Sequence, residues 1–245
     1  MVSTYEKRVG NENQILELLS RYGYLRIRDL ALGVWRPNAS DQMARKTLLR
    51  LREDGYVAEK RWTDGTLFFA LSIKGANRLR KLGVNAHSTA PLLNRMVNVE
   101  HRCKANEISL IYEMDPENRV YTEHQIQAGR HPIAHAFNKI PDYFVETVHG
   151  GLWGEVENSR RSTKDFNRLL RWLRLITEHQ EGFLPELNGL PELYLFRIEF
   201  VCSEAFERRL LRGLADVVAV KPGEGRTVAG LVEDFVDEWL WFRRS

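Results

Sequence analysis

The stretch of sequence that decides the fold runs from residue 40 to residue 71 and reads SDQMARKTLLRLREDGYVAEKRWTDGTLFFAL. Its first half predicts a helix over residues 41–54, because Ser40 offers an N-cap hydroxyl and Gly55 is a stop signal. The apolar residues of this helix recur at helical spacing, which predicts an inward face made of Ala44, Leu48 and Leu51.

The second half of the stretch predicts a β-hairpin. Residues 56–62 and 66–71 are extended runs, and the turn sequence Thr63-Asp64-Gly65 separates them. Two more helices are expected earlier, over residues 14–19 and 27–33. Three helices followed by a two-stranded wing are the plan of a winged helix-turn-helix, so we expect such a DNA-binding domain over residues 1–85.

A second domain is expected over residues 92–245. A helix over residues 74–82 closes the first domain, and the polar residues 83–91 form the linker. The next elements are expected in the order α-β-β-β-α-β: a helix at 98–113, strands at 120–123, 142–148 and 152–158, a helix at 163–178 and a strand at 193–202. A short strand at 215–220 and an amphipathic helix at 228–240 follow. The fold class expected is therefore α+β.

Composition describes an ordinary globular protein. The 245 residues are 43% hydrophobic and 28% charged. No apolar run approaches the roughly 20 residues of a membrane span, and the polar residues 1–10 do not form a secretory signal. Cys103 and Cys202 belong to no zinc or disulfide pattern. We expect a cytoplasmic protein without a membrane span.

The charges are unevenly distributed along the chain. Residues 1–92 hold 16 Lys and Arg against 9 Asp and Glu, whereas residues 93–245 hold 20 against 24. A basic region followed by an acidic one suits nucleic-acid binding followed by a carboxylate–metal site. An uneven surface without functional meaning is the alternative.

The helix at 41–54 carries the expected DNA-reading face. Its polar side, opposite the apolar residues, consists of Gln42, Arg45, Lys46 and Arg50. Gln and Arg can bond base edges in a major groove, while Lys46 and the wing residues Lys60 and Arg61 suit phosphates. A solvated basic helix, or a winged helix that binds protein, is the alternative.

Acidic residues mark a candidate site in the second domain. Glu155 and Glu157 share a face of one expected strand, and Asp142 begins its antiparallel neighbour. Three converging carboxylates suit Mg²⁺ or Mn²⁺, which can polarise a phosphate and activate water. Glu123 is expected on the preceding strand as a fourth acidic ligand or a supporting partner.

Basic residues follow the acidic ones. They are Arg160, Arg161, Lys164, Arg168 and Arg171, and the last three align on the expected helix. This stripe can hold the DNA backbone against the metal, with Lys164 stabilising developing charge. A solvated helix face is the alternative.

The pattern Pro141-Asp142, a short spacer and Glu155-x-Glu157 on an α-β-β-β-α-β layout resembles the PD-(D/E)xK nuclease superfamily. Glu157 stands where that pattern has lysine. Because lysine migration to a helix is a variation within the superfamily, Lys164 is the expected substitute. Together with the winged helix, the sequence is more narrowly similar to the replication-relaxation proteins and the MOBC class of plasmid mobilisation relaxases.

This resemblance implies nicking of DNA at the transfer origin of a plasmid or integrative element. Its implied partners are a double-stranded recognition site, a single strand at the nick, and conjugation or relaxosome proteins. The His-hydrophobic-His motif of the common relaxases is absent, and His131 and His135 are expected in a loop. Tyr121 and Tyr143 are alternative covalent nucleophiles, although metal-activated water is simpler.

Two other function classes compete with the nuclease. A non-enzymatic winged-helix regulator or replication-control protein, with a degenerate nuclease fold, would explain Glu157 in the lysine position. A nucleotide-driven enzyme is disfavoured, because neither G-x-x-x-x-G-K-[ST] nor G-x-G-x-x-G occurs.

Overall fold

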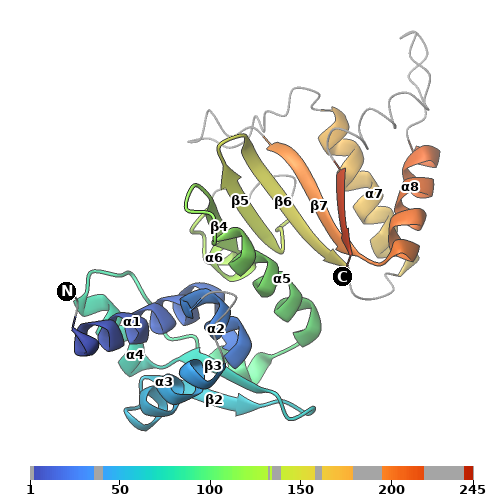
Figure 1. Cartoon of the computed structure of the whole chain (residues 1–245). Helices are drawn as coiled ribbons and strands as arrows, with labels where there is room; N and C mark the ends of the chain where they lie inside the picture. Colours follow the sequence, from blue (N-terminus) through green and yellow to red (C-terminus); the bar gives the residue numbers. More distant parts are fainter. Residues whose placement is uncertain are drawn as a thin grey trace. The chain divides into compact units, whose positions relative to one another are not determined.

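The computed structural model describes residues 3–35, 41–131, 133, 139–157, 162–178, 195–217 and 240–244 (Figure 1). The chain divides into two compact units, Met1–Pro116 and Glu117–Ser245, and each contains helices and a sheet. The α+β class expected from the sequence is confirmed. Within the described residues, no helix is both long enough and apolar enough to cross a membrane.

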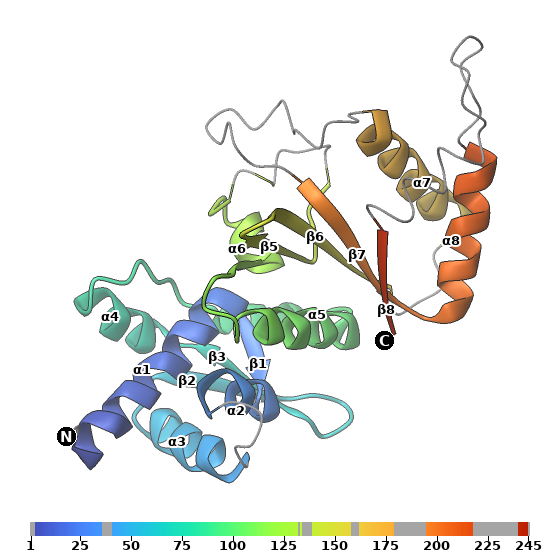
Figure 2. The ribbon, with the colours of Figure 1, turned by 45° about the horizontal axis from the view of Figure 1, so that its top comes forward.

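The first unit packs helices against a small antiparallel sheet, as Figure 2 shows. Its elements are α1 (Thr4–Tyr22), β1 (Tyr24–Arg26), α2 (Ile27–Trp35), α3 (Asp41–Glu53), β2 (Val57–Arg61), β3 (Leu67–Leu71), α4 (Ile73–Lys81), the 3-10 helix η1 (Ala90–Arg95) and α5 (Val99–Tyr112). The strand order is β1-β3-β2, with both pairs antiparallel.

Local sequence signals account for most of this unit. The helix expected at 41–54 is α3, and its predicted inward residues Ala44, Leu48 and Leu51 are buried, together with Thr47. The expected hairpin is β2–β3, whose turn is closed by the bond from Trp62 N to Thr66 O. The first helix is much longer than expected, because a capping box of Ser3 and Glu6 starts it at Thr4.

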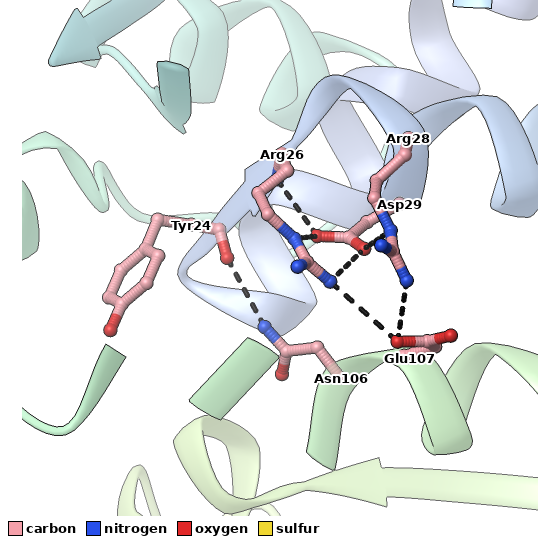
Figure 3. A network of polar contacts seen from close by, with 6 residues as sticks. All are labelled: Tyr24, Arg26, Arg28, Asp29, Asn106 and Glu107. Carbon is pink, nitrogen blue, oxygen red and sulfur yellow. Dashed lines mark hydrogen bonds and ion pairs between the residues drawn. The ribbon is translucent and has the colours of Figure 1, made fainter. Parts of the chain in front are cut away.

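A polar network joins α5 to the start of α2, as Figure 3 shows. The buried carboxylate of Asp29 accepts from the backbone N–H of Arg26 and from its guanidinium. Arg28 reaches from α2 to Glu107 on α5 at 2.8 Å, and the Asn106 amide donates to the carbonyl of Tyr24. The helix that we assigned to the start of the second domain therefore belongs to the first unit, which ends at Pro116 rather than near residue 85.

The second unit is built on a five-stranded mixed sheet. Its elements are β4 (Arg119–Thr122), α6 (Glu123–Gln127), β5 (Tyr143–Thr147), β6 (Gly150–Glu157), α7 (Thr163–Glu178), β7 (Leu195–Cys202), α8 (Glu204–Val217) and β8 (Leu240–Arg244). The order β4-β5-β6-β7-β8 follows the chain. The β4–β5 and β5–β6 pairs are antiparallel, whereas β6–β7 and β7–β8 are parallel.

Two amphipathic helices, α7 and α8, cover one face of this sheet. They pack against each other, and their buried residues join one cluster with residues from β5, β6, β7 and β8. From the sheet this cluster takes Phe144, Trp153, Leu195, Ile198, Phe200, Cys202 and Leu240. We call the side of the sheet on which these residues lie the helix-covered face.

Two expectations for the end of the chain need correction, and one helix was not expected. The strand expected at 215–220 is wrong for residues 215–217, which complete α8, and residues 218–220 lie outside the described residues. Most of the helix expected at 228–240 also lies outside them, but its last residue, Leu240, begins strand β8. Helix α8 was not among the expected elements, although Phe206, Leu210 and Leu214 recur at helical spacing and are buried.

Candidate functional site

Asp142 and Glu155 lie next to each other where β5 begins. Asp142 directly precedes β5, and its backbone N–H donates to the carbonyl of Gly154 at 3.0 Å. Its carboxylate oxygen Oδ2 accepts from the N–H of Val156 at 2.7 Å. The two bonds join Asp142 to Gly154 and Val156, the neighbours of Glu155 on β6. They therefore hold Asp142 beside Glu155.

Glu155 and Glu157 point to the helix-covered face. Each is paired in register with a β7 residue of the cluster on that face, Glu155 with Phe200 and Glu157 with Cys202. Both are buried, with 2% and 6% of their surface exposed. The pKa of Glu155 is raised, mainly by burial. The Lys139 ammonium opposes this shift, and the negative charge of Asp142 adds to it.

Lys139 supplies the positive charge at this point. Its ammonium bonds to Oε1 of Glu155, and the indole N–H of Trp153 donates to the same oxygen at 2.6 Å. The ammonium also lies 5.0 Å from the ring centre of Trp172 on α7 and 6.0 Å from that of Trp153. Lys139, Asp142 and Glu155, with the two tryptophans, form the candidate site.

The candidate site was incompletely predicted from the sequence. The three carboxylates come from the expected strands, but Lys139 lies outside them, just before the strand expected at 142–148. Its signal was available in the same segment, since Lys139-Ile140-Pro141-Asp142 puts a cation three residues before the acid.

The fit of a divalent metal ion can be tested on these residues. Among the described residues, no group of three or more His, Cys, Asp or Glu side chains is arranged to hold a metal ion. The donor chemistry of Asp142 and Glu155 nevertheless suits Mg²⁺ or Mn²⁺, and Lys139 provides the cation that the buried Glu155 requires in this arrangement. The buried indole nitrogen of Trp172 has no hydrogen-bond partner among the described residues and, being a donor only, does not ligate a cation.

Glu123 lies near Asp142 through its backbone. It begins helix α6 instead of ending a strand, as we had expected, and its N–H donates to the carbonyl of Asp142 at 3.2 Å. Its carboxylate accepts from the side chain of Gln127 at 2.6 Å, one turn along the same helix.

The predicted basic residues of α7 are exposed. Lys164 lies in the first turn, Arg168 pairs with Asp165 at 3.6 Å, and Arg171 donates to the carbonyl of Asn167. Eight residues, or about 12 Å along a helix, separate Lys164 from Trp172. Lys139 is thus the lysine that contacts Glu155 and Trp172. Arg160 and Arg161 lie outside the described residues.

The two candidate tyrosine nucleophiles are engaged elsewhere. Tyr143 is buried, and its hydroxyl donates to Glu199 at 2.5 Å. Since Tyr143 pairs with Gly154, and Gly154 with Glu199, this contact lies on the sheet face opposite Glu155. Tyr121 donates to Glu146 at 3.4 Å, and burial raises the pKa of its hydroxyl.

His131 is buried and lies in the loop that follows α6. Its Nε2 lies 3.1 Å from Glu146, and its Nδ1 accepts from the N–H of Ile133. Burial lowers the pKa of this imidazole. His135 lies outside the described residues.

The predicted DNA-reading residues of α3 are all exposed. They are Gln42, Arg45, Lys46 and Arg50. Arg50 lies 3.8 Å from Glu12 of α1. In the hairpin, Lys60 donates to the carbonyl of Leu93 at 2.6 Å, and Arg61 donates to that of Gly65 at 2.9 Å. Arg45 and Lys46 make no hydrogen bond or ion pair with any described residue.

Comparison of the chain with family models, curated proteins and solved structures finds no match.

Proposed function

We propose that this chain is a DNA-processing protein that holds duplex DNA with its first unit and cleaves a phosphodiester bond with its second. The observation that carries the proposal is the meeting of Lys139, Asp142 and Glu155 at the start of β5, beside the end of β6. A buried acid, a neighbouring acid and a lysine are the groups that metal-dependent phosphodiester cleavage needs.

The first unit supports DNA binding as a winged helix-turn-helix. Helices α1, α2 and α3 precede the hairpin β2–β3, and α3 exposes a polar, basic side. Arg45 and Lys46 extend from this side into solvent, where they can meet phosphates or base edges.

The second unit supports a nuclease of the PD-(D/E)xK type. Strands β4, β5 and β6, helix α7 and strand β7 follow one another in the expected order, with the short α6 inserted after β4. The Pro-Asp pair lies at the start of β5, and the Glu-x-Glu sequence ends β6. This arrangement brings the first acid of the pattern next to the second.

Each residue of the site has a distinct role in the proposal. Asp142 and Glu155 would hold an Mg²⁺ or Mn²⁺ ion, and among the described residues Glu157 does not join them in a group of three acids. Such an ion would supply polarisation of the scissile phosphate and activation of a water molecule. Lys139 supplies positive charge to the phosphate, the role that we had expected of Lys164. Trp153 and Trp172 enclose the ammonium, and Trp153 orients Glu155.

The resemblance to MOBC-class relaxases narrows the proposed reaction to nicking of one strand at a transfer origin. Conjugation or relaxosome proteins would be the partners in that setting. The basic residues Lys164 and Arg168, exposed on α7, are available to hold the strand.

A non-enzymatic DNA-binding regulator is the second candidate. The ion pair between Lys139 and Glu155 favours it, because a lysine that permanently neutralises the buried acid leaves that acid unavailable to a metal ion. Glu157 in place of the pattern's lysine favours it also.

A nicking assay separates the two candidates. Duplexes selected by the protein from a random-sequence library are cloned into a supercoiled plasmid, which is then incubated with protein and Mn²⁺. We expect open circles with the wild type and none with Asp142→Asn or Glu155→Gln. Glu204→Gln, which removes an exposed acid from α8, is the control and should nick normally. Tight binding without nicking by the wild type in either Mn²⁺ or Mg²⁺ would establish the regulator.

A further inference from the structure

One line of residues on α3 faces directly away from the core of the first unit. The buried residues Ala44, Thr47, Leu48 and Leu51 define the inward side. Positions 42, 46, 49 and 53, spaced by four, three and four residues, lie opposite to them. These positions hold Gln42, Lys46, Leu49 and Glu53, and all four are exposed. We call them the outer row.

Leu49 is the apolar member of the outer row. Its side chain is 48% exposed although its neighbours on the surface are charged. Arg45 precedes it by one helical turn and Arg50 follows it directly. A single exposed leucine is common on protein surfaces. Leu49 differs from such a residue in its position, in the middle of the row that a DNA-binding helix would turn toward the groove.

Arg45, Lys46 and Arg50 outnumber the acid Glu53 around Leu49, and this positive balance favours DNA as the occupant of this surface. Arg45 and Lys46 make no hydrogen bond or ion pair with the described residues, so their positive charges remain available for phosphates. A protein partner with an apolar patch would instead leave these two cations facing an uncharged surface.

We infer that Leu49 reads thymine through its 5-methyl group in the major groove. This inference rests on the proposed function of the first unit and adds the base that one residue of α3 recognises. The thymine methyl is the apolar feature of the major-groove edges, and apolar side chains contact it there. Gln42, about 10 Å away along the helix, has the amide that pairs with adenine and would read a different base pair.

Replacing thymine with uracil tests this inference, because uracil lacks only the methyl group. The probe is a duplex selected by wild-type protein from a random-sequence library. Each thymine is replaced singly, and affinity is measured for wild type and for Leu49→Ala. We expect one replacement to weaken wild-type binding about fourfold, the ratio that burial of one methyl group gives, and to leave Leu49→Ala binding unchanged. Ile73→Ala, which shortens an exposed residue of α4, should behave as wild type.

Two results would overturn the inference, and they differ in meaning. If wild type binds the duplex but is indifferent to every replacement, or if Leu49→Ala keeps the wild-type ratio, the reading of thymine by Leu49 is wrong while DNA binding stands. If wild type selects no duplex, the proposed DNA-binding function fails and this inference fails with it.

Discussion

The ammonium group of Lys139 bonds to the carboxylate of Glu155, a residue on β6 that is only 2% exposed. A buried carboxylate is costly unless it is paired, and the indole N–H of Trp153 supplies a second bond to the same oxygen. This pair links the loop before β5 to the centre of the sheet. It determines both the stability of the candidate site and its availability to a metal ion.

Removing the ammonium should destabilise the second unit. Lys139→Met keeps most of the apolar stem but leaves Glu155 buried without its cation, at a cost of about 3–5 kcal/mol in the free energy of unfolding. The double variant Lys139→Met with Glu155→Gln should recover much of this loss, because it removes the unpaired charge as well. Urea unfolding at neutral pH measures both. Equal losses in the single and double variants would show that the ion pair contributes little.

The raised pKa of Glu155 predicts the direction of a pH effect on stability. Because the folded pKa lies above the ordinary value of 4.5, the folded state binds more protons than the unfolded state between these two values. The stabilisation from Glu155 is therefore fully present below pH 4.5 and is lost as the pH rises through the folded pKa. Lys139→Met should extend this loss to higher pH, since the lysine lowers the pKa. Unfolding across a pH series, with Glu155→Gln as reference, checks the slope.

Metal binding should depend on the two adjacent acids. In calorimetric titrations with Mn²⁺, we expect Asp142→Asn and Glu155→Gln to abolish the binding heat. Glu123→Gln should retain it, because the Glu123 carboxylate is bonded within its own helix at 2.6 Å. A loss of affinity in the Glu123 variant equal to that of the Asp142 variant would restore Glu123 to the ligand set that the sequence suggested.

The sequence predicted the parts of the fold whose signals are local. The helix at 163–178 was predicted with the bounds of α7, and the hairpin turn at Thr63-Asp64-Gly65 matches the structure, because both depend on periodicity and turn chemistry. Strand β1 was missed because three residues show no period, and its pairing partner, β3, lies more than forty residues away. Strand β8, five residues long, is likewise held by pairing with β7.

The site was predictable only where strand alternation determines it. Glu155 and Glu157 share a face in any strand, so their common orientation followed from spacing alone. The contact of Lys139 with Glu155 depends on how the loop returns to the sheet, which no local pattern records. The buried pair of Tyr143 and Glu199, 56 residues apart, depends on the parallel register of β6 and β7 in the same way.

Salt dependence of DNA binding tests the basic side of α3. Arg45→Ala combined with Lys46→Ala should weaken binding to the selected duplex and reduce the slope of log affinity against log salt by about 1 for each phosphate that is no longer neutralised. The Mn²⁺ affinity of the second unit should be unchanged. Lys81→Ala, at the exposed end of α4, is the control and should leave the slope as in wild type. An unaltered slope in the double variant would mean that α3 does not meet the phosphates.

Gly154 is expected to be irreplaceable for a reason that can be tested without DNA or metal. A Cβ at this position would overlap the ring of Tyr143, which lies over Gly154. The hydroxyl of this ring donates to Glu199. Gly154→Ala should therefore cost about 1–3 kcal/mol of unfolding free energy through overpacking. Gly10, in α1, has no atom within 4 Å of an added Cβ, so Gly10→Ala should stabilise by about 0.5–1 kcal/mol, as alanine does inside a helix. If the Tyr143 ring lies over Gly154, Gly154→Ala should lower the midpoint temperature of thermal unfolding and Gly10→Ala should raise it. A neutral Gly154→Ala would mean that the Tyr143 ring can move aside to accept the added methyl group.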